Sequence, residues 1–277
     1  MIRFLVDTSS DYTVVEAKER EIELIPIHVT FGEDDYRDAY ELNKDYFYEL
    51  LTSSEEFPKT AQPAPQEFVD AFEKAEENGE EVIGILLSSK LSGTFQSATL
   101  SKNIVDYDKV HLVDSLGATH MIRLMTDYGQ QLAKEGKTAT EIVSALEELK
   151  TKIKVLAVVD TLEYLCKGGR LSRTAAAIGE MAKVKPMITV SEGEVTVIGK
   201  SLGKNKAIGN LLKALEECEV DERFPIYSVY TVGTENCEAF EKRLNAAGYE
   251  FKDRLQVGAT IGTHVGPGVF GMIFVTK

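Results

Sequence analysis

The sequence has few of the residues from which disulfide frameworks and dedicated metal sites are built. It contains no tryptophan and, in 277 residues, three cysteines: Cys166, Cys218 and Cys237. An odd number of widely spaced cysteines predicts free thiols in a reducing compartment. Neither a Cys-x-x-Cys nor a His-Glu-x-x-His pattern occurs. We therefore expect no dedicated metal site, and no other cofactor is predicted.

Positive charge and long apolar runs are also scarce. The chain sets 31 lysines and arginines against 45 aspartates and glutamates, a formal net charge of -14. This balance argues against a general nucleic-acid binder and against adsorption to anionic membranes. No apolar run approaches the roughly 20 residues of a membrane helix, and residues 1–6 are too few for a signal-peptide core. The sequence predicts a cytoplasmic protein without stable membrane insertion.

The most informative segment that is present runs from Glu81 to Ser97. An apolar stretch from Val82 to Leu87 stops abruptly in a turn dense in serine, glycine and threonine, and a helical pattern follows. A helix start presents unpaired N–H groups and a partial positive charge. Hydroxyls and a glycine at that point form a small cradle for an anion. We therefore expect a carboxylate or a phosphate to dock at Ser92-Gly93-Thr94.

Strands and helices alternate through the first half of the chain. Strands are predicted at residues 2–6, 22–31, 82–87 and 110–113, and Pro26 would place the second at an edge or bulge. Helices are predicted near residues 42–51, 66–77, 95–103, 119–134 and 141–150, the last begun by the capping box Thr138–Glu141. A short helix is predicted at the capping box Thr13–Glu16. Residues 58–65 are predicted to be a proline-stiffened loop. This alternation favours a mainly parallel sheet with its ligand site at the carboxyl ends of the strands.

The pattern changes in the second half. Strands are predicted at residues 155–159, 226–230, 255–261 and 269–275, and helices at 161–166, 174–182, 204–216 and 237–247. Residues 187–198 resemble a hairpin around Ser191-Glu-Gly-Glu194. A hairpin implies a partly antiparallel sheet. We therefore predict an α/β fold of two domains, residues 1–155 with a mainly parallel α/β/α arrangement and residues 156–277 with a mixed or antiparallel sheet.

Three short motifs in predicted loops carry the candidate chemistry: Lys59-Thr-Ala-Gln-Pro63, Leu91-Ser-Gly-Thr94 and Gly262-Thr-His-Val-Gly-Pro-Gly268. They offer hydroxyls from Thr60 and Ser92, backbone donors near Gly93 and Thr94, and an imidazole from His264. Such donors suit a carboxylate, which accepts several hydrogen bonds through two oxygens.

Each of these residues also has a purely structural interpretation. Ser92 could cap a helix and Thr60 could satisfy turn backbone. Arg170, after two glycines, could be a solvated surface charge or a contact for a partner protein. The glycines around His264 indicate close backbone approach to another group, and histidine readily changes charge near neutral pH.

Taken together, five segments resemble the DegV family of bacterial fatty-acid-binding proteins. They are the three motifs above, the opening Phe4-Leu-Val-Asp-Thr-Ser-Ser-Asp11 and Lys167-Gly-Gly-Arg-Leu-Ser172. The resemblance covers essentially the whole chain in the same order. It implies two α/β domains that bury a long-chain fatty acid. Many family members are the carrier subunit of a fatty acid kinase.

The resemblance also implies roles for individual residues. Thr60, Ser92 and His264 would hold the carboxylate, and Arg170 would face protein partners. Many relatives have Thr-Ser-Gln-Pro where this chain has Thr-Ala-Gln-Pro, so Ala61 lacks one hydroxyl. The implied partners are an ATP-dependent fatty acid kinase, which would convert the bound acid to acyl phosphate, and an acyltransferase that uses acyl phosphate in phospholipid metabolism. No Gly-x-x-x-x-Gly-Lys-Ser/Thr segment for ATP occurs in the sequence.

Two other functions fit parts of the pattern. Ser92 and His264, with Asp7 or Asp114 as the acid, could form a hydrolase triad, although the Gly-x-Ser-x-Gly elbow of such enzymes is missing. A binder of phosphorylated metabolites could use the same helix start. That function would need several cations, and Lys90 is the only one close in sequence to the turn.

Overall fold

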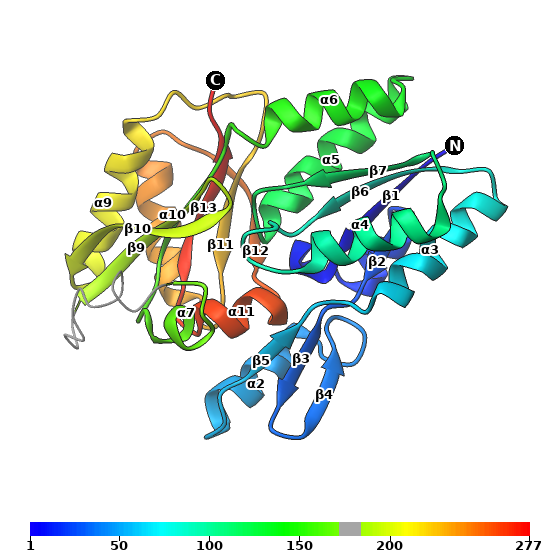
Figure 1. Cartoon of the computed structure of the whole chain (residues 1–277). Helices are drawn as coiled ribbons and strands as arrows, with labels where there is room; N and C mark the ends of the chain where they lie inside the picture. The colour runs from blue at the N-terminus through cyan, green and yellow to red at the C-terminus, as the bar shows by residue number, and fades with distance from the viewer. Residues whose placement is uncertain (172–183) are drawn as a thin grey trace.

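The computed structural model describes residues 1–171 and 184–277, so the helix predicted at residues 174–182 lies outside the described residues. The chain forms two lobes, each built on its own β-sheet, and the first lobe also carries a small three-stranded sheet that lies below both (Figure 1). The fold is therefore of the α/β class with two sheet-based domains, as predicted. The expected boundary at residue 155 falls within β8, the first strand of the second sheet.

The sheet of the first lobe is parallel throughout. Its strand order is β2-β1-β6-β7, with β1 at Ile2–Asp7, β2 at Ile22–Ile25, β6 at Glu81–Leu86 and β7 at Val110–Asp114. The connecting helices are α1 (Val14–Glu19), α3 (Pro65–Glu77), α4 (Thr94–Val105), α5 (His120–Lys134) and α6 (Ala139–Leu149). The capping boxes predicted from the sequence at Thr13 and Thr138 both form.

The carboxyl ends of these strands meet at one edge, as the sequence indicated. The Asp7 carboxylate accepts hydrogen bonds from the Leu87 amide at 2.7 Å and the Ser9 amide at 2.9 Å. The Asp114 carboxylate accepts one from the Ser89 amide at 3.2 Å. The Asp7 carboxylate and the Leu87 amide, 80 residues apart in sequence, thereby fix strand ends from which the loops of the site leave the sheet.

The sheet of the second lobe is mixed. Its order is β10-β9-β8-β13-β11-β12, in which β11 and β12 alone pair in parallel. The strands are β8 (Ile153–Val158), β9 (Val184–Ser191), β10 (Glu194–Leu202), β11 (Ile226–Tyr230), β12 (Phe251–Gln256) and β13 (Phe270–Val275). The helices are α7 (Glu163–Lys167), α9 (Lys204–Glu216), α10 (Glu235–Ala246) and α11 (Ala259–Val265). The predicted hairpin is confirmed as β9–β10.

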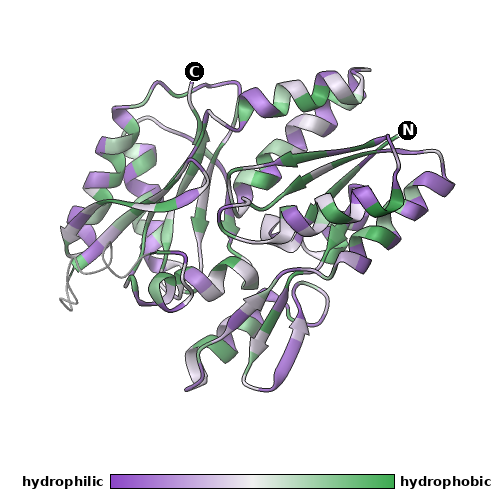
Figure 2. Cartoon of the chain, viewed as in Figure 1, coloured by the Kyte–Doolittle hydropathy of each residue, from purple (hydrophilic) through white to green (hydrophobic). Residues whose placement is uncertain are grey.

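The helices cover the sheets in layers (Figure 1). Helices α3 and α4 bury Phe68, Phe72 and Ala98 against one face of the first sheet. Helices α9 and α10 bury another apolar cluster against the outer face of the second sheet. Helix α5 lies between the lobes, where its first two turns are buried on nearly all sides. Both sheets are largely hydrophobic, while the outer helices carry polar stripes (Figure 2), the pattern of an amphipathic helix on a core.

Two predicted elements of the first half differ from the structure. The strand predicted at residues 22–31 breaks at Pro26 into β2 and β3 (His28–Phe31), which belong to different sheets, because proline cannot donate to a ladder. Strand β3 pairs with β4 (Asp34–Arg37) and with β5 (Lys59–Ala61) in the small sheet, against which α2 (Lys44–Ser53) packs. The predicted loop at residues 58–65 therefore contains a strand, and Thr60 pairs with Val29.

The prediction for residues 255–268 was wrong in part. The last residues of the predicted strand and the first part of the predicted loop form helix α11 (Ala259–Val265), which is flanked by Gly258 and Gly266. His264 therefore lies on a helix and not in a loop. Thr260 and Ile261 favour strand locally, but contacts of this segment with the first lobe outweigh that preference.

Candidate functional site

A pocket lies between the two lobes and encloses about 880 Å³ of space between atoms, part of it open to solvent. Most of its described lining is apolar, and the polar residues are few. The polar lining residues are Thr60, Ser92, Thr119, Arg170, Thr189, Thr260 and His264. A largely apolar cavity with a few convergent polar groups is the usual form of a small-molecule site.

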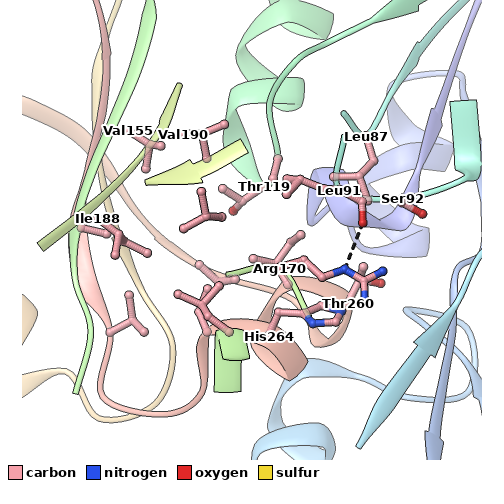
Figure 3. A pocket seen from close by; sticks show the side chains of 18 of the residues that line it. Leu87, Leu91, Ser92, Thr119, Val155, Arg170, Ile188, Val190, Thr260 and His264 are labelled. Atoms are coloured by element: carbon pink, nitrogen blue, oxygen red, sulfur yellow. Dashed lines mark hydrogen bonds between the residues drawn. The ribbon is translucent and has the colours of Figure 1, made fainter. Parts of the chain in front are cut away.

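The apolar wall of the pocket is one face of the second sheet. It includes Val155 and Ala157 of β8, Ile188 and Val190 of β9, and Val229 of β11. Their alternation along the strands follows from the two-residue period of β-structure. The intervening residues of β8, Leu156 and Val158, face α9 and α10 instead. Figure 3 shows Val155, Val190 and Ile188 on the side of the pocket away from Ser92.

The polar end of the pocket joins Thr60 and His264, which are 204 residues apart in sequence. Thr60 Oγ1 and His264 Nε2 lie 2.9 Å apart, within hydrogen-bonding distance. Thr60 is on β5 of the small sheet and His264 is on α11, so this contact joins the first lobe to the second. The structure thus brings together two of the residues predicted to hold a carboxylate.

His264 is a neutral imidazole at neutral pH, contrary to the expectation that it changes charge there. Burial, and secondarily the nearby positive charge of Arg170, lowers its pKa from 6.5 to about 4. Its Nδ1 atom is buried and has no hydrogen-bond partner among the described residues. A Cβ added at Gly168 would lie 2.3 Å from that atom. The first glycine of the Lys167–Arg170 motif therefore serves close packing against His264.

The glycines around His264 also allow close approach, as the sequence indicated, but to protein side chains. A Cβ at Gly262 would lie 2.6 Å from the Phe47 ring, and one at Gly266 would lie 2.4 Å from the Tyr164 ring. Gly266 also has a φ of 75°, a conformation that favours glycine. These glycines let α11 pack tightly between its neighbours.

The hydroxyl turn before α4 forms a compact unit at the same end of the pocket. Ser92 Oγ lies 2.9 Å from Thr94 Oγ1 and accepts a hydrogen bond from the Thr94 amide at 3.3 Å. The helix itself begins at Thr94, with Gly93 at the N-cap position. Ser92 therefore supports the helix start, in line with the interpretation that it caps a helix, and it also lines the pocket. Thr94 is fully buried beneath the turn.

Two of the sequence motifs pack directly on each other. A Cβ added at Gly93 would lie 1.8 Å from the Gln62 side-chain oxygen. Ser97 Oγ donates to the Pro63 carbonyl at 3.0 Å. Gln62 and Pro63 of the Thr60 motif are thus seated on the first turn of α4. A side chain at position 93 would therefore displace the Gln62 side chain from the first turn of α4.

Arg170 extends along the pocket between the Ser92 turn and His264 (Figure 3). Its Nε donates to the Leu91 carbonyl at 3.0 Å, and Nη1 donates to the Gly168 carbonyl at 2.5 Å. Burial lowers the pKa of this guanidinium from its usual value. Lys90 is the cation closest in sequence to the Ser92 turn, but the guanidinium that contacts this turn is that of Arg170, from the second lobe. The predicted contact of Arg170 with partners stays a prediction.

The geometry does not assemble the hydrolase triad. The partner of His264 Nε2 is Thr60, and no carboxylate within the described ranges contacts Nδ1. Asp7 and Asp114 accept hydrogen bonds from backbone amides at the strand ends. The phosphorylated-metabolite alternative is also disfavoured, because Arg170 is the one cation in the described lining of a mostly apolar pocket.

Sequence reasoning did not single out Thr119, Thr189 or Thr260, nor the apolar lining residues. Strand β8 carried a signal for the latter, since residues 155–158 are apolar on both faces and one face must cover something other than the outer helices. In the chain outside residues 172–183 there is no group of three or more potential metal ligands. Within the same ranges, no helix is both long and apolar enough to cross a membrane.

Comparisons with known proteins agree with this architecture. The chain matches the family described as "Uncharacterised protein, DegV family" over residues 1–277. A DegV domain-containing protein of Caldanaerobacter subterraneus subsp. tengcongensis is 34% identical over 281 residues, which cover 100% of this chain and 99% of the relative.

Solved structures of similar proteins have the same fold. DegV of Bacillus subtilis, described as a fatty acid binding protein, is 30% identical with a TM-score of 0.85, covering 100% of this chain and 99% of that one. A DegV family protein of Thermus thermophilus, described by its fatty acid binding, is 28% identical with a TM-score of 0.89 and the same coverage. The chain therefore belongs to the DegV family.

Proposed function

We propose that this protein binds a long-chain fatty acid, with the acyl chain in the pocket between the lobes and the carboxylate at Thr60, Ser92 and His264. The observation that carries the proposal is the polarity of the pocket, which is apolar along the second sheet and ends in hydroxyl and imidazole groups. Fatty acids have the same division between a long apolar tail and one small acidic group. The descriptions of the Bacillus subtilis and Thermus thermophilus relatives support the same ligand class.

The tail supplies the affinity in this proposal. Burial of each methylene contributes about 0.8 kcal/mol, so a chain of some 16 carbons offers roughly 12 kcal/mol before the costs of ordering are subtracted. The lining along β8, β9 and β11 has no charged group among its described residues. The polar end then decides orientation more than affinity.

A neutral imidazole suits this orientation because it can donate one hydrogen bond without a buried charge. With the proton on Nε2, His264 donates to Thr60 Oγ1, which leaves the threonine hydroxyl free to donate to the carboxylate. Ser92 Oγ offers a further hydroxyl close to Thr94. Arg170 adds positive charge nearby, while its Nε stays engaged with the Leu91 carbonyl.

We further propose that the protein is a cytoplasmic carrier and not an enzyme by itself. A separate ATP-dependent kinase would phosphorylate the exposed carboxylate, so that the carboxylate oxygen takes the terminal phosphoryl group of ATP and ADP is released. The acyl phosphate would then serve an acyltransferase of phospholipid metabolism. The resemblance to kinase carrier subunits supports this step, and Arg170, which is half-buried beside the Ser92 turn, is proposed to contact the partner as well as the pocket.

The first test is solvent extraction of freshly purified protein followed by mass spectrometry. We expect a long-chain fatty acid at close to one per protein molecule. Ser92→Ala, Thr60→Ala and His264→Ala are then compared with wild type by titration with a fluorescent fatty acid. Weakened binding with an unchanged far-UV circular dichroism spectrum is expected for each. Wild-type affinity in all three would remove the carboxylate assignment.

The second test separates carrier from enzyme. Purified protein, fatty acid and ATP are incubated without a kinase, and acyl phosphate is assayed by trapping with hydroxylamine. We expect no product until a fatty acid kinase subunit is added. A fluorophosphonate probe should leave Ser92 unlabelled, and covalent labelling there would favour a hydrolase instead.

A further inference from the structure

Helix α11 belongs to the second lobe in sequence, yet the first lobe holds it at regular intervals. Gly258 contacts Asp11, Thr260 contacts Asp38, and His264 contacts Thr60. Between these points Gly262 packs against Phe47 and Tyr48 of α2. The position of the imidazole in the pocket therefore depends on where the first lobe fixes this helix.

Asp38 holds the first turn of α11. Its Oδ2 atom accepts hydrogen bonds from the Thr260 amide at 3.0 Å and from Thr260 Oγ1 at 2.5 Å. The Asp38 side chain is buried, and Thr260 lines the pocket. A carboxylate that accepts from a helix amino end satisfies donors that have no partner within the helix. The contact spans 222 residues of sequence and joins the end of β4 to α11.

Asp11 holds the residue before the helix and a strained part of the pocket wall. Its Oδ1 atom accepts from the Gly258 amide at 2.8 Å, and its Oδ2 atom accepts from Thr119 Oγ1. Thr119 lines the pocket with a φ of 55°, which is unfavourable for a β-branched residue. Such a conformation persists only where the surroundings impose it. A Cβ at Gly258 would lie 2.7 Å from Asp11 Oδ1, so glycine is needed there.

The charges around the two carboxylates are only partly balanced. Lys44 donates to the backbone carbonyls of Asp11 at 2.9 Å and Gln256 at 2.8 Å, and it does not form a direct ion pair with either carboxylate in the structure. The His120 Nε2 atom lies 3.3 Å from Asp11 Oδ2, and burial lowers the pKa of His120 well below 6.5. Burial also raises the pKa of Asp11 to about 7 and that of Asp38 to about 6.

Tyr48 and Arg123 complete the surroundings of this cluster. Buried carboxylates with so little direct compensation are costly to keep, and their acceptor atoms are directed at segments that line the pocket. An apolar residue of the same size at either position would leave the Gly258 or Thr260 amide without this acceptor, so the two carboxylates fix the geometry of these segments.

We infer that Asp11 and Asp38 are positioning residues, which fix the amino end of α11 from the first lobe and thereby bring His264 to Thr60 in the fatty-acid head-group site. The consequence for fatty-acid affinity rests on the proposed function. The consequence for the environment of His264 rests on the geometry alone and can be measured without a ligand.

The test compares Asp38→Ala with Asp38→Asn in the full-length protein. The asparagine oxygen can still accept from both Thr260 donors, whereas alanine cannot. Imidazole ¹H–¹⁵N NMR of the ligand-free protein, with His264 assigned from the spectrum of His264→Gln, reports the protonation of this ring. In Asp38→Ala we expect the pKa of His264 to rise toward its ordinary value and fluorescent fatty-acid affinity to fall about tenfold. Asp38→Asn should restore most of both properties.

Asp221→Asn is the matched control. Asp221 is also a buried aspartate, but it is bound to Arg223 outside the pocket lining. This variant should leave the His264 signals at their wild-type positions, which shows that loss of a buried carboxylate elsewhere does not move them. Unchanged His264 signals in folded Asp38→Ala would overturn the inference, whatever the affinity.

Thr260→Val makes the same test if Asp38→Ala does not fold, because it removes the hydroxyl and keeps the shape. Its His264 signals should shift in the direction expected for Asp38→Ala, and wild-type signals would overturn the inference. If wild-type protein binds no fatty acid while these signals respond as expected, the proposed function fails and the positioning role stands. If wild-type protein binds fatty acid and the His264 signals of the variants do not respond, the proposed function stands and the positioning role fails.

Discussion

The two ends of the pocket are built in different ways. The apolar wall comes from strands of one sheet, the neighbours β9 and β8 and, beyond β13, β11. Their hydrogen-bonded registers set the positions of Val155, Ile188 and Val229. The polar end comes from β5, the turn before α4, helix α11 and the segment after α7, which meet only when the lobes pack together.

This difference indicates which amino-acid substitutions should impair ligand binding at each end of the pocket. A wall made from one sheet depends on the size and polarity of individual side chains, because the strand positions are fixed by backbone pairing. A site made from four segments depends on contacts between lobes, so a substitution outside the pocket can move it.

The largest effect should follow from a charge in the apolar wall. Val190→Asp places a carboxylate beside the acyl chain on the apolar wall, while Arg170, the one cation in the described lining, is engaged with the Leu91 and Gly168 carbonyls. An unpaired buried charge costs several kcal/mol, so we expect fluorescent fatty-acid affinity to fall by about 100-fold or more.

Ile198→Asp is the control for this variant, because Ile198 lies on the adjacent strand β10 and is 43% exposed. It should bind within about twofold of wild type, since exposed substitutions rarely have large effects. Equal losses in the two variants would show that the effect comes from the hairpin and not from the pocket wall.

The polar end should show a smaller loss and strong coupling. Thr60→Val and His264→Gln each disturb the contact between Thr60 Oγ1 and His264 Nε2. A lost hydrogen bond of this kind is worth about 1 kcal/mol, so each variant should bind roughly five- to tenfold more weakly. The double variant should lose little more than either single one, because both remove the same contact. Additive losses measured by calorimetry would mean that the two side chains contact the ligand independently.

The positioning carboxylates should give the protein a distinct pH dependence. Burial raises the pKa of Asp11 from 3.8 to about 7, so its contribution to the free energy of unfolding is fully present below pH 3.8 and is lost as the pH rises through 7. Asp11→Asn does not titrate. We expect the melting temperature of wild type relative to Asp11→Asn to fall by a few degrees between pH 5 and pH 8, at roughly 2–4 °C per kcal/mol.

His264 should act in the opposite sense and over a lower range. Its pKa is lowered from 6.5 to about 4, so its contribution is present above pH 6.5 and is lost as the pH falls through 4. Because His264 is present in both wild type and Asp11→Asn, its contribution cancels in the comparison, which reports the aspartate. If the melting temperature of wild type instead rises relative to that of Asp11→Asn between pH 5 and pH 8, the raised pKa of Asp11 is contradicted.

The smallest effect on fatty-acid binding is expected for Arg170→Ala. The side chain anchors the Leu91 carbonyl beside Ser92, and its removal loosens the turn without removing a predicted carboxylate contact. We expect affinity to fall about two- to threefold, while turnover by a fatty acid kinase falls further because the proposed partner contact is lost. Arg170→Lys keeps the charge but not the planar donor group. Full kinase turnover in Arg170→Ala would exclude the partner role.

Several features could be read from the sequence for local reasons. The capping boxes at Thr13 and Thr138, the hairpin around Gly193 and the hydroxyl turn at Ser92 each depend on residues within a few positions of one another. Helix α11 could not be read in this way. Its residues Thr260 and Ile261 favour strand, and its start is stabilised by Asp38, a partner 222 residues away.

The sequence by itself determined the fold class, the family resemblance and the residue types at the polar end of the pocket, because periodicity and short motifs are local properties. Tertiary structure alone decided that His264 lies on a helix, that it is neutral, and that Arg170 reaches Leu91. Burial and distance between lobes set these properties, and neither quantity is encoded in the spacing of residues along the chain.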